Sequence, residues 1–361
     1  MDFDLTEEQQ LLGDVTREVL SRNADIGGEP GWRRQVWDQL AEVGILGLGF
    51  DPEEAGQIEI MVVATELGRR LAPEPVAEAA LIPGGLIAEV GSDEQKKVLD
   101  DVASGATLLA FAHGEPGMRV PTDRLTTTAV RSGDTWTVTG RKNPVLAGDS
   151  ADTVIVTAAL PDGGAGLFLV DGEATTRHPY RTFDGKSGAQ LDFDSAPADP
   201  LGNGGAAADH IARTVIRHQS VLCAEAVGAM AEALRLTTEY LTSRKQFGVP
   251  LSSFQTLTQR AADMYVSLEL ARSMNFYAAM SITDGTFDPV IAARAKLQIG
   301  RSGRHIAQEA IQLHGGIGMT AEYPVGHYAA RLTAIDTTYG TADDQLRTLI
   351  PHIGSYGTVS L

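Results

Sequence analysis

Cysteine is almost absent from the sequence, and this limits its covalent chemistry. Cys223 is the one cysteine among 361 residues, so no disulfide can form within the chain. A cysteine-poor chain is typical of a reducing compartment, and we expect Cys223 to be a small buried apolar residue rather than a nucleophile. The sequence therefore favours a cytoplasmic protein whose stability comes from its core.

Signals for export or membrane insertion are lacking as well. The opening residues, MDFDLTEEQQLL, are acidic and contain no basic segment followed by an apolar one, so we expect no signal peptide. No stretch of about 18 residues is apolar and uncharged enough to span a bilayer. We therefore expect no membrane span.

Positive charge is scarce relative to negative charge. The chain carries 29 Lys and Arg against 47 Asp and Glu, a net charge of −18. Such a surface repels phosphate backbones, which argues against nucleic-acid binding. An anionic nucleotide would need local cations or helix N-termini. With 43% hydrophobic residues, the chain is long and apolar enough for a large core and one to three domains.

The hydrophobic pattern changes twice along the chain. Apolar residues at three- and four-residue spacing predict helices in the first part, and Thr6 forms a capping-box pattern at the first of them. Short alternating runs separated by turn residues then predict a small antiparallel β domain. The helical period returns after the β region. The sequence thus predicts an α+β fold with domains at residues 1–105, 106–203 and 204–361.

Three long helices are expected in the last region, over Ile211–Tyr240, Phe254–Ile282 and Pro289–Leu313. Each is several turns longer than an average helix. Long helices joined by short connections favour a bundle.

Two motifs lie at the ends of these helices. SRKQFGVPL runs from Ser243 to Leu251, and QLHGGIGM runs from Gln312 to Met319. Arg244 falls where a long helix should end, where the helix dipole stabilises a cation and the guanidinium offers paired donors to a pyrophosphate. Gly315 and Gly316 break a helix and let a ligand approach the backbone.

These two motifs, the opening LTEEQ and the three-part layout resemble the acyl-CoA dehydrogenase family over nearly the whole chain. The resemblance implies a C-terminal four-helix bundle and FAD-dependent α,β-desaturation of an acyl-CoA, with an electron-transfer flavoprotein as electron acceptor. In the family, the two motifs reach across a subunit interface and hold the ADP half of the neighbour's FAD. The residues implied in cofactor binding are Arg244, Gln246, Phe247, Gln255, Gln312, Gly315 and Gly316.

Other family positions have changed. The β-domain threonine is replaced by Gly114, and a tryptophan and a threonine that hold the flavin ring are replaced by Pro144 and Leu146. The usual catalytic glutamate is replaced by Tyr339, and a phenol with a pKa of about 10 is a poor base at neutral pH. Some family members place the base near the start of the first long C-terminal helix, which falls here on His218. The sequence therefore assigns no firm catalytic residue.

The changes are selective, because the ring and base positions are altered while the ADP-binding positions remain. The pattern predicts a non-catalytic subunit that completes the FAD site of a second acyl-CoA dehydrogenase subunit. It resembles the base-lacking subunit of the actinobacterial α2β2 enzymes of steroid catabolism, which implies a steroid-derived acyl-CoA. Two alternatives stay open: a complete homo-oligomeric dehydrogenase with His218 as base, and a non-enzymatic acyl-CoA-binding scaffold.

Overall fold

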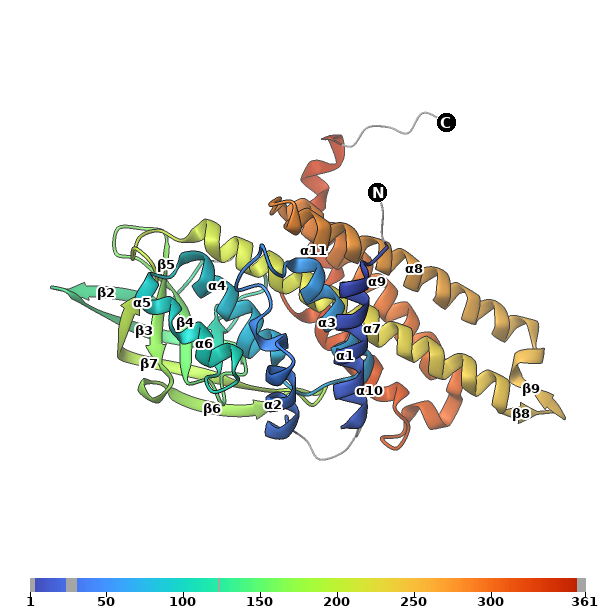
Figure 1. Cartoon of the computed structure of the whole chain (residues 1–361). Coiled ribbons are helices and arrows are strands. Elements are labelled where there is room, and N and C mark those ends of the chain that lie inside the picture. Colours follow the sequence, from blue (N-terminus) through green and yellow to red (C-terminus); the bar gives the residue numbers. More distant parts are fainter. Residues whose placement is uncertain (1–3, 24–30, 123, 356–361) are drawn as a thin grey trace.

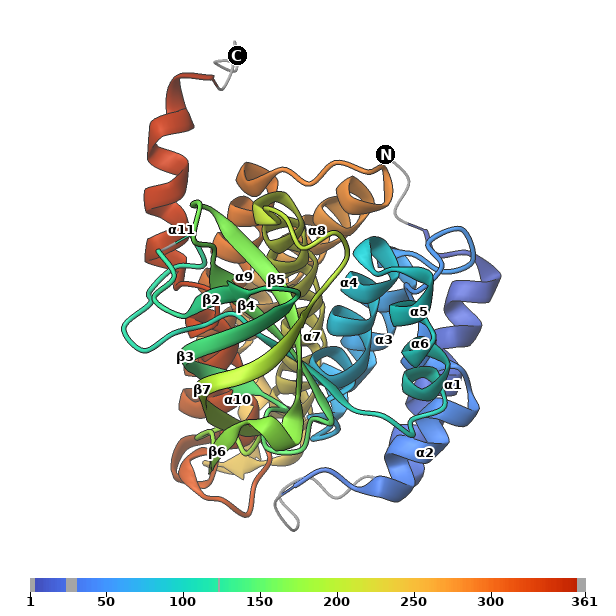
Figure 2. The ribbon, with the colours of Figure 1, turned by 90° about the vertical axis from the view of Figure 1, so that its left-hand side faces the viewer.

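The computed structural model describes residues 4–23, 31–122 and 124–355. Helices, a β-sheet and long helices follow one another along the chain, which confirms the predicted α+β fold (Figure 1). In the view of Figure 2, the sheet lies on one side and the N-terminal helices on the other, with α7 between them.

The N-terminal region is helical. Thr6 caps its first helix, and Thr6 and Gln9 form the reciprocal bonds of the predicted capping box. A π-helical turn, η2, runs directly into α4. The elements are α1 (Glu7–Arg22), α2 (Arg34–Glu42), η1 (Ile45–Gly47), α3 (Gln57–Arg70), η2 (Ala77–Leu81), α4 (Ile82–Val90), α5 (Asp93–Lys96) and α6 (Val98–Ala103).

A seven-stranded sheet follows, in the order β1-β4-β2-β3-β7-β5, with β6 paired to β7. The additional pairing of β4 with β5 closes five of the strands into a ring around a small apolar core. The pairs are antiparallel as expected, except that β4 runs parallel to β1 and to β2. The strands are β1 (Leu109–Ala112), β2 (Thr128–Ser132), β3 (Thr135–Leu146), β4 (Thr153–Ala159), β5 (Ala165–Asp171), β6 (Thr176–Arg181) and β7 (Ser187–Pro200), with η3 (Gly172–Ala174) between β5 and β6.

The C-terminal region is a bundle of long helices. The three predicted helices are present, each with ends within three residues of the expected ones. None of the helices in the described part of the chain is long and apolar enough to cross a membrane. The elements are α7 (Ala208–Ser243), β8 (Lys245–Gln246), β9 (Val249–Pro250), η4 (Leu251–Ser253), α8 (Gln255–Thr283), α9 (Pro289–His314), η5 (Gly315–Met319), α10 (Val325–Thr337), α11 (Ala342–Leu349) and η6 (Ile350–Ser355).

Two glycines let α3 and α7 pack backbone against backbone. A Cβ on Gly68 would lie 1.9 Å from the carbonyl oxygen of Glu225, and one on Gly228 would lie 1.8 Å from that of Thr65. Real Cβ atoms do not approach so closely, so any larger residue forces the helices apart. This contact fixes the N-terminal helices against α7 and brings η2 beside it.

Candidate functional site

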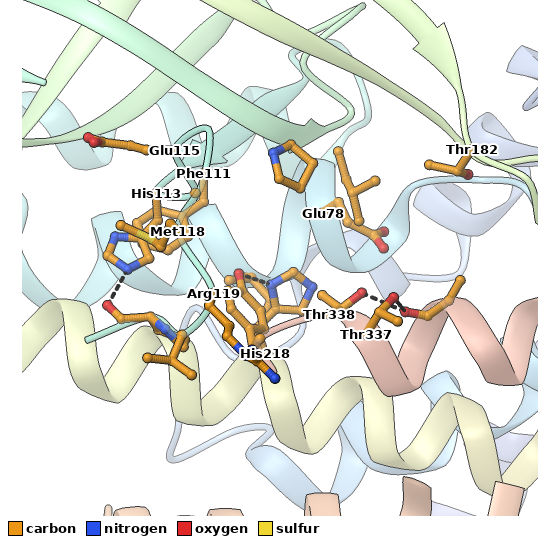
Figure 3. A pocket seen from close by; sticks show the side chains of 18 of the residues that line it. Glu78, Phe111, His113, Glu115, Met118, Arg119, Thr182, His218, Thr337 and Thr338 are labelled. Carbon is orange, nitrogen blue, oxygen red and sulfur yellow. Dashed lines mark hydrogen bonds between the residues drawn. The ribbon is translucent and has the colours of Figure 1, made fainter. Parts of the chain in front are cut away.

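A cavity of about 490 Å³ lies where the sheet, the N-terminal helices and the C-terminal bundle meet. Its walls come from η2, from β1 and the loop after it, from β3 and β6, from α7, and from the end of α10. Figure 3 shows side chains from these elements facing a common space. The lining is mainly apolar and includes Ile82, Phe111, Met118, Leu146 and Phe183.

His218 and Tyr339 form the polar floor of this cavity. His218 Nδ1 lies 2.9 Å from the Tyr339 hydroxyl, and the two rings meet edge to face. Burial lowers the pKa of His218 to about 4 and raises the pKa of Tyr339. Both groups are therefore neutral at pH 7. The pairing brings together the two positions that the sequence had singled out for the missing base.

Tyr339 is held in place from two sides. Its backbone has a φ of 58°, a left-handed conformation that is costly for a bulky residue. Gln345 Nε2 donates to its carbonyl oxygen at 2.9 Å. The buried Lys296 ammonium donates to the carbonyl oxygen of Ile335 at 2.6 Å, at the end of α10. These contacts direct the phenol toward α7 and the cavity.

A buried cluster of five charged residues stands behind the cavity wall. Arg331 binds both carboxylate oxygens of Glu225, at 2.8 and 2.6 Å, and donates to Asp184 at 2.7 Å. Lys186 lies 3.2 Å from Glu225 and 3.5 Å from Glu78. The cluster joins η2, the β6–β7 turn, α7 and α10. Only Glu78 of the five lines the cavity itself.

The positions that the resemblance assigns to the flavin ring also line the cavity. Gly114, Pro144 and Leu146 offer no side-chain hydrogen-bond donor. A Cβ on Gly114 would lie 3.3 Å from both the Cδ and the carbonyl oxygen of Pro144, so the two replacements fit each other and a threonine at 114 would be crowded.

The polar residues next to these positions are already satisfied. Glu115 accepts from Lys142 at 2.8 Å and from the backbone of Thr126 and Thr127. His113 binds Thr157 and the carbonyl oxygen of Pro121. At the positions that the resemblance assigns to the flavin ring, the side chains of this chain therefore offer the ring no hydrogen-bond donor.

The Arg244 motif forms the far end of the bundle. Arg244 caps the C-terminus of α7 and is exposed, and none of the described carboxylates forms an ion pair with it. Phe247 and Gly248 both have positive φ and form a two-residue turn between β8 and β9. Phe247, at the tip, is 92% exposed. Gln246 and Gln255 are exposed beside it.

The second motif ends at the same place. Tyr240, in the last turn of α7, packs against His314 at the end of α9 and against Tyr323 beyond it, with ring centroids 4.6 and 6.2 Å away. Gln312 is exposed in the last turn of α9. A Cβ at Gly315 or Gly316 would meet nothing within 4 Å, so the backbone is open to a ligand. All seven predicted cofactor-binding residues thus lie at one end of the bundle.

This end is far from the chain's own cavity. His218 and Arg244 lie 26 residues apart on and just after α7, which at a rise of 1.5 Å per residue separates them by about 39 Å. Figure 1 shows α7 and α8 running away from the sheet to the β8–β9 hairpin.

Several site residues were not predicted from sequence. Glu78 and Glu225 interrupt apolar helical stretches, VAEAALI and CAEAVGAM, which is a signal of a buried functional or paired charge. Lys186 binds Glu78 and Arg331 binds Glu225, and each pair is separated by more than a hundred residues in the sequence. No local pattern identifies such pairs.

The sequence matches two family profiles, acyl-CoA dehydrogenase N-terminal domain over residues 6–106 and acyl-CoA dehydrogenase C-terminal domain over residues 211–353. Acyl-CoA dehydrogenase FadE28 of Mycobacterium tuberculosis is 30% identical over 97% of this chain and 98% of its own length. The probable acyl-CoA dehydrogenase YngJ of Bacillus subtilis is 28% identical over 96% and 97%.

Solved structures agree with these matches. A variant of the Tcur3481-Tcur3483 steroid ACAD superposes with a TM-score of 0.89 at 30% identity, covering 97% of this chain and 98% of that one. The ChsE4-ChsE5 complex from Mycobacterium tuberculosis gives 0.89 at 25% identity, covering 99% and 100%. The chain belongs to the acyl-CoA dehydrogenase family.

Proposed function

We propose that this chain is the non-catalytic subunit of a heteromeric, FAD-dependent acyl-CoA dehydrogenase. FAD is the cofactor of the family. In this proposal the chain holds the ADP half of an FAD whose flavin ring is seated in a second, catalytic subunit. The observation that carries it is Tyr339, a buried neutral phenol bonded to His218 at the position where the family has its catalytic glutamate, in a chain that keeps the exposed Arg244 end.

The chemistry at each end supports the same division of roles. At the bundle end, the Arg244 guanidinium can pair with a pyrophosphate, the open glycine backbone can approach it, and the exposed Phe247 ring can stack on a base. At the cavity end, Pro144 and Leu146 offer the flavin ring no donor, and Tyr339 is hydrogen-bonded to a neutral imidazole where a base is needed.

The assembly follows from these roles. FAD supplies the hydride acceptor for α,β-desaturation of the acyl-CoA, and the catalytic subunit supplies the carboxylate that removes the α-proton. Two of the similar solved structures are named as pairs of proteins, and one of these is named as a steroid ACAD. We therefore propose an α2β2 complex, cytoplasmic and acting in steroid catabolism on a steroid-derived acyl-CoA, with an electron-transfer flavoprotein as acceptor.

Flavin content tests the proposal. The chain purified alone should be colourless, and its complex with a second family member that retains the catalytic glutamate should hold about one FAD per heterodimer. Arg244→Ala should lower the FAD content of that complex, whereas Arg131→Ala, at an exposed arginine on β2, should leave it unchanged.

Two results would contradict the proposal. Full FAD occupancy and turnover by the lone chain, lost in His218→Ala, would favour the homo-oligomeric dehydrogenase with His218 as base. An FAD content of the complex that stays unchanged in Arg244→Ala would favour the non-enzymatic acyl-CoA-binding scaffold.

A further inference from the structure

Two buried polar atoms facing the cavity have no hydrogen-bond partner among the described residues: Glu78 Oε2 and His218 Nε2. Their residues are only 4% and 6% exposed. Buried polar atoms in folded proteins are nearly always paired with protein groups, water or a ligand. Figure 3 shows both side chains at the cavity, Glu78 from η2 and His218 from α7.

The two atoms have opposite hydrogen-bonding roles. The direction of the bond between Tyr339 and His218 Nδ1 depends on the imidazole tautomer; we assign the phenol as donor, because this uses its one proton, and Nδ1 then accepts. A neutral imidazole that accepts at Nδ1 carries its proton at Nε2, which is therefore a free donor. Glu78 Oε1 lies 3.5 Å from the Lys186 ammonium, and Oε2 is left as a free acceptor.

Glu78 and His218 line the same cavity, and the charge of Glu78 affects the imidazole. Burial dominates the lowered pKa of His218, and Glu78 is the charged group that opposes it most strongly. Glu78 likewise acts on Tyr339. Glu78 also lies in a π-helical turn, a rare conformation that is frequent at functional sites.

One ligand group satisfies a donor and an acceptor through a single atom: a hydroxyl. It accepts from His218 Nε2 and donates to Glu78 Oε2. The rest of the cavity is lined largely by carbon, and its volume of about 490 Å³ is much larger than a single water requires. We propose that this cavity binds an apolar alcohol, with its hydroxyl between Glu78 and His218 and its hydrocarbon body against the apolar lining. This site is separate from the nucleotide-binding end and needs no flavin.

A pair of isomeric probes tests the assignment. Decanol and methyl nonyl ether have the same formula, but the ether cannot donate a hydrogen bond to Glu78. Calorimetric titration of the purified chain should show decanol binding at least about tenfold more tightly than the ether, because a site built to bond a hydroxyl rejects an analogue that leaves it unpaired. Equal affinities, or no binding of either probe, would overturn the proposal.

Substitutions then test whether Glu78 causes the preference for decanol over the ether. Glu78→Leu removes the acceptor and should abolish the preference for decanol while the ether still binds, which shows that the cavity is intact. Glu269→Leu, at an exposed glutamate on α8, should keep the full preference. A preference retained in Glu78→Leu refutes the assignment. Should Glu78→Leu fail to fold, His218→Leu gives the same comparison from the donor side.

Discussion

Removing the Arg331 side chain should destabilise the protein more than removing any exposed arginine. Its guanidinium is almost fully buried and makes three short bonds, two to Glu225 and one to Asp184. Arg331→Met keeps most of the volume but leaves the three carboxylates of the cluster with the single Lys186 ammonium. Removal of one partner from a buried ion pair costs about 3–5 kcal/mol.

This cost converts into a measurable shift in melting temperature. An unfolding entropy of about 2.1 cal/mol/K per residue gives about 0.76 kcal/mol/K for 361 residues. Arg331→Met should therefore lower the Tm by about 4–7 °C in scanning calorimetry if the chain melts as one unit. Arg304→Met is the matched control, because Arg304 is mostly exposed and its 3.4 Å pair with Asp336 contributes less than about 1 kcal/mol.

The pH dependence of the free energy of unfolding gives a second test of the ion pair between Arg331 and Glu225. Burial raises the pKa of Glu225, but the ion pairs with Arg331 and Lys186 outweigh it and lower that pKa to about 2. Glu225 therefore stabilises the folded chain above about pH 4, and this contribution is lost as the pH falls toward 2. In Arg331→Met the pKa of Glu225 should rise. The difference in free energy of unfolding between wild type and variant should therefore become smaller as the pH falls.

A double variant separates the ion pair from simple packing. Arg331→Met with Glu225→Gln should be more stable than Arg331→Met alone, because no uncompensated carboxylate remains at Glu225. A loss below 1 kcal/mol in the single variant, or a double variant less stable than the single one, would refute the reasoning.

Three further predictions concern other parts of the molecule. Gly228→Ala should lower the free energy of unfolding by about 3 kcal/mol or more, since its Cβ would lie 1.8 Å from Thr65 O, whereas Gly316→Ala meets open space and should be neutral in urea denaturation. His218→Phe should flatten the fall in stability between about pH 6.5 and 4, because the wild-type imidazole has a pKa of about 4 when folded and about 6.5 when unfolded. Phe247→Ala should change stability by less than about 0.5 kcal/mol, since the ring is 92% exposed, yet should weaken FAD retention in the complex, measured by flavin release on gel filtration.

The sequence predicted those elements whose signals are local. The helix over 211–240 follows from a repeated apolar spacing, and α7 extends it by only three residues at each end. Arg244 was expected at a helix end and is the C-cap of α7. Thr6 was expected to cap α1 and does so with Gln9. Each of these features depends on residues within a few positions of one another.

The elements that the sequence did not predict depend on distant partners. Strand β6 (Thr176–Arg181) lies beside β7 at the edge of the sheet, contains Pro179 and is mostly exposed, so it has no alternating apolar face. The charged cluster joins Glu78 to Lys186 and Glu225 to Arg331, so its pairs appear only when the fold is known. The cavity itself is enclosed by segments from all three regions of the chain.

Under the proposed function, the cavity and the Arg244 end have separate fates, and the length of α7 gives a physical reason why they can. The cavity residue His218 and the helix cap Arg244 are joined by a single helix, about 39 Å apart. Changes at sites so far apart, with no shared contacts, have nearly independent effects on stability and binding. Pro144, Leu146 and Tyr339 can therefore alter the cavity without disturbing the exposed arginine and glycines at the far end. In the proposed subunit the cavity is then left to a different ligand, and the unpaired atoms of Glu78 and His218 are the reason why we propose a hydroxyl there.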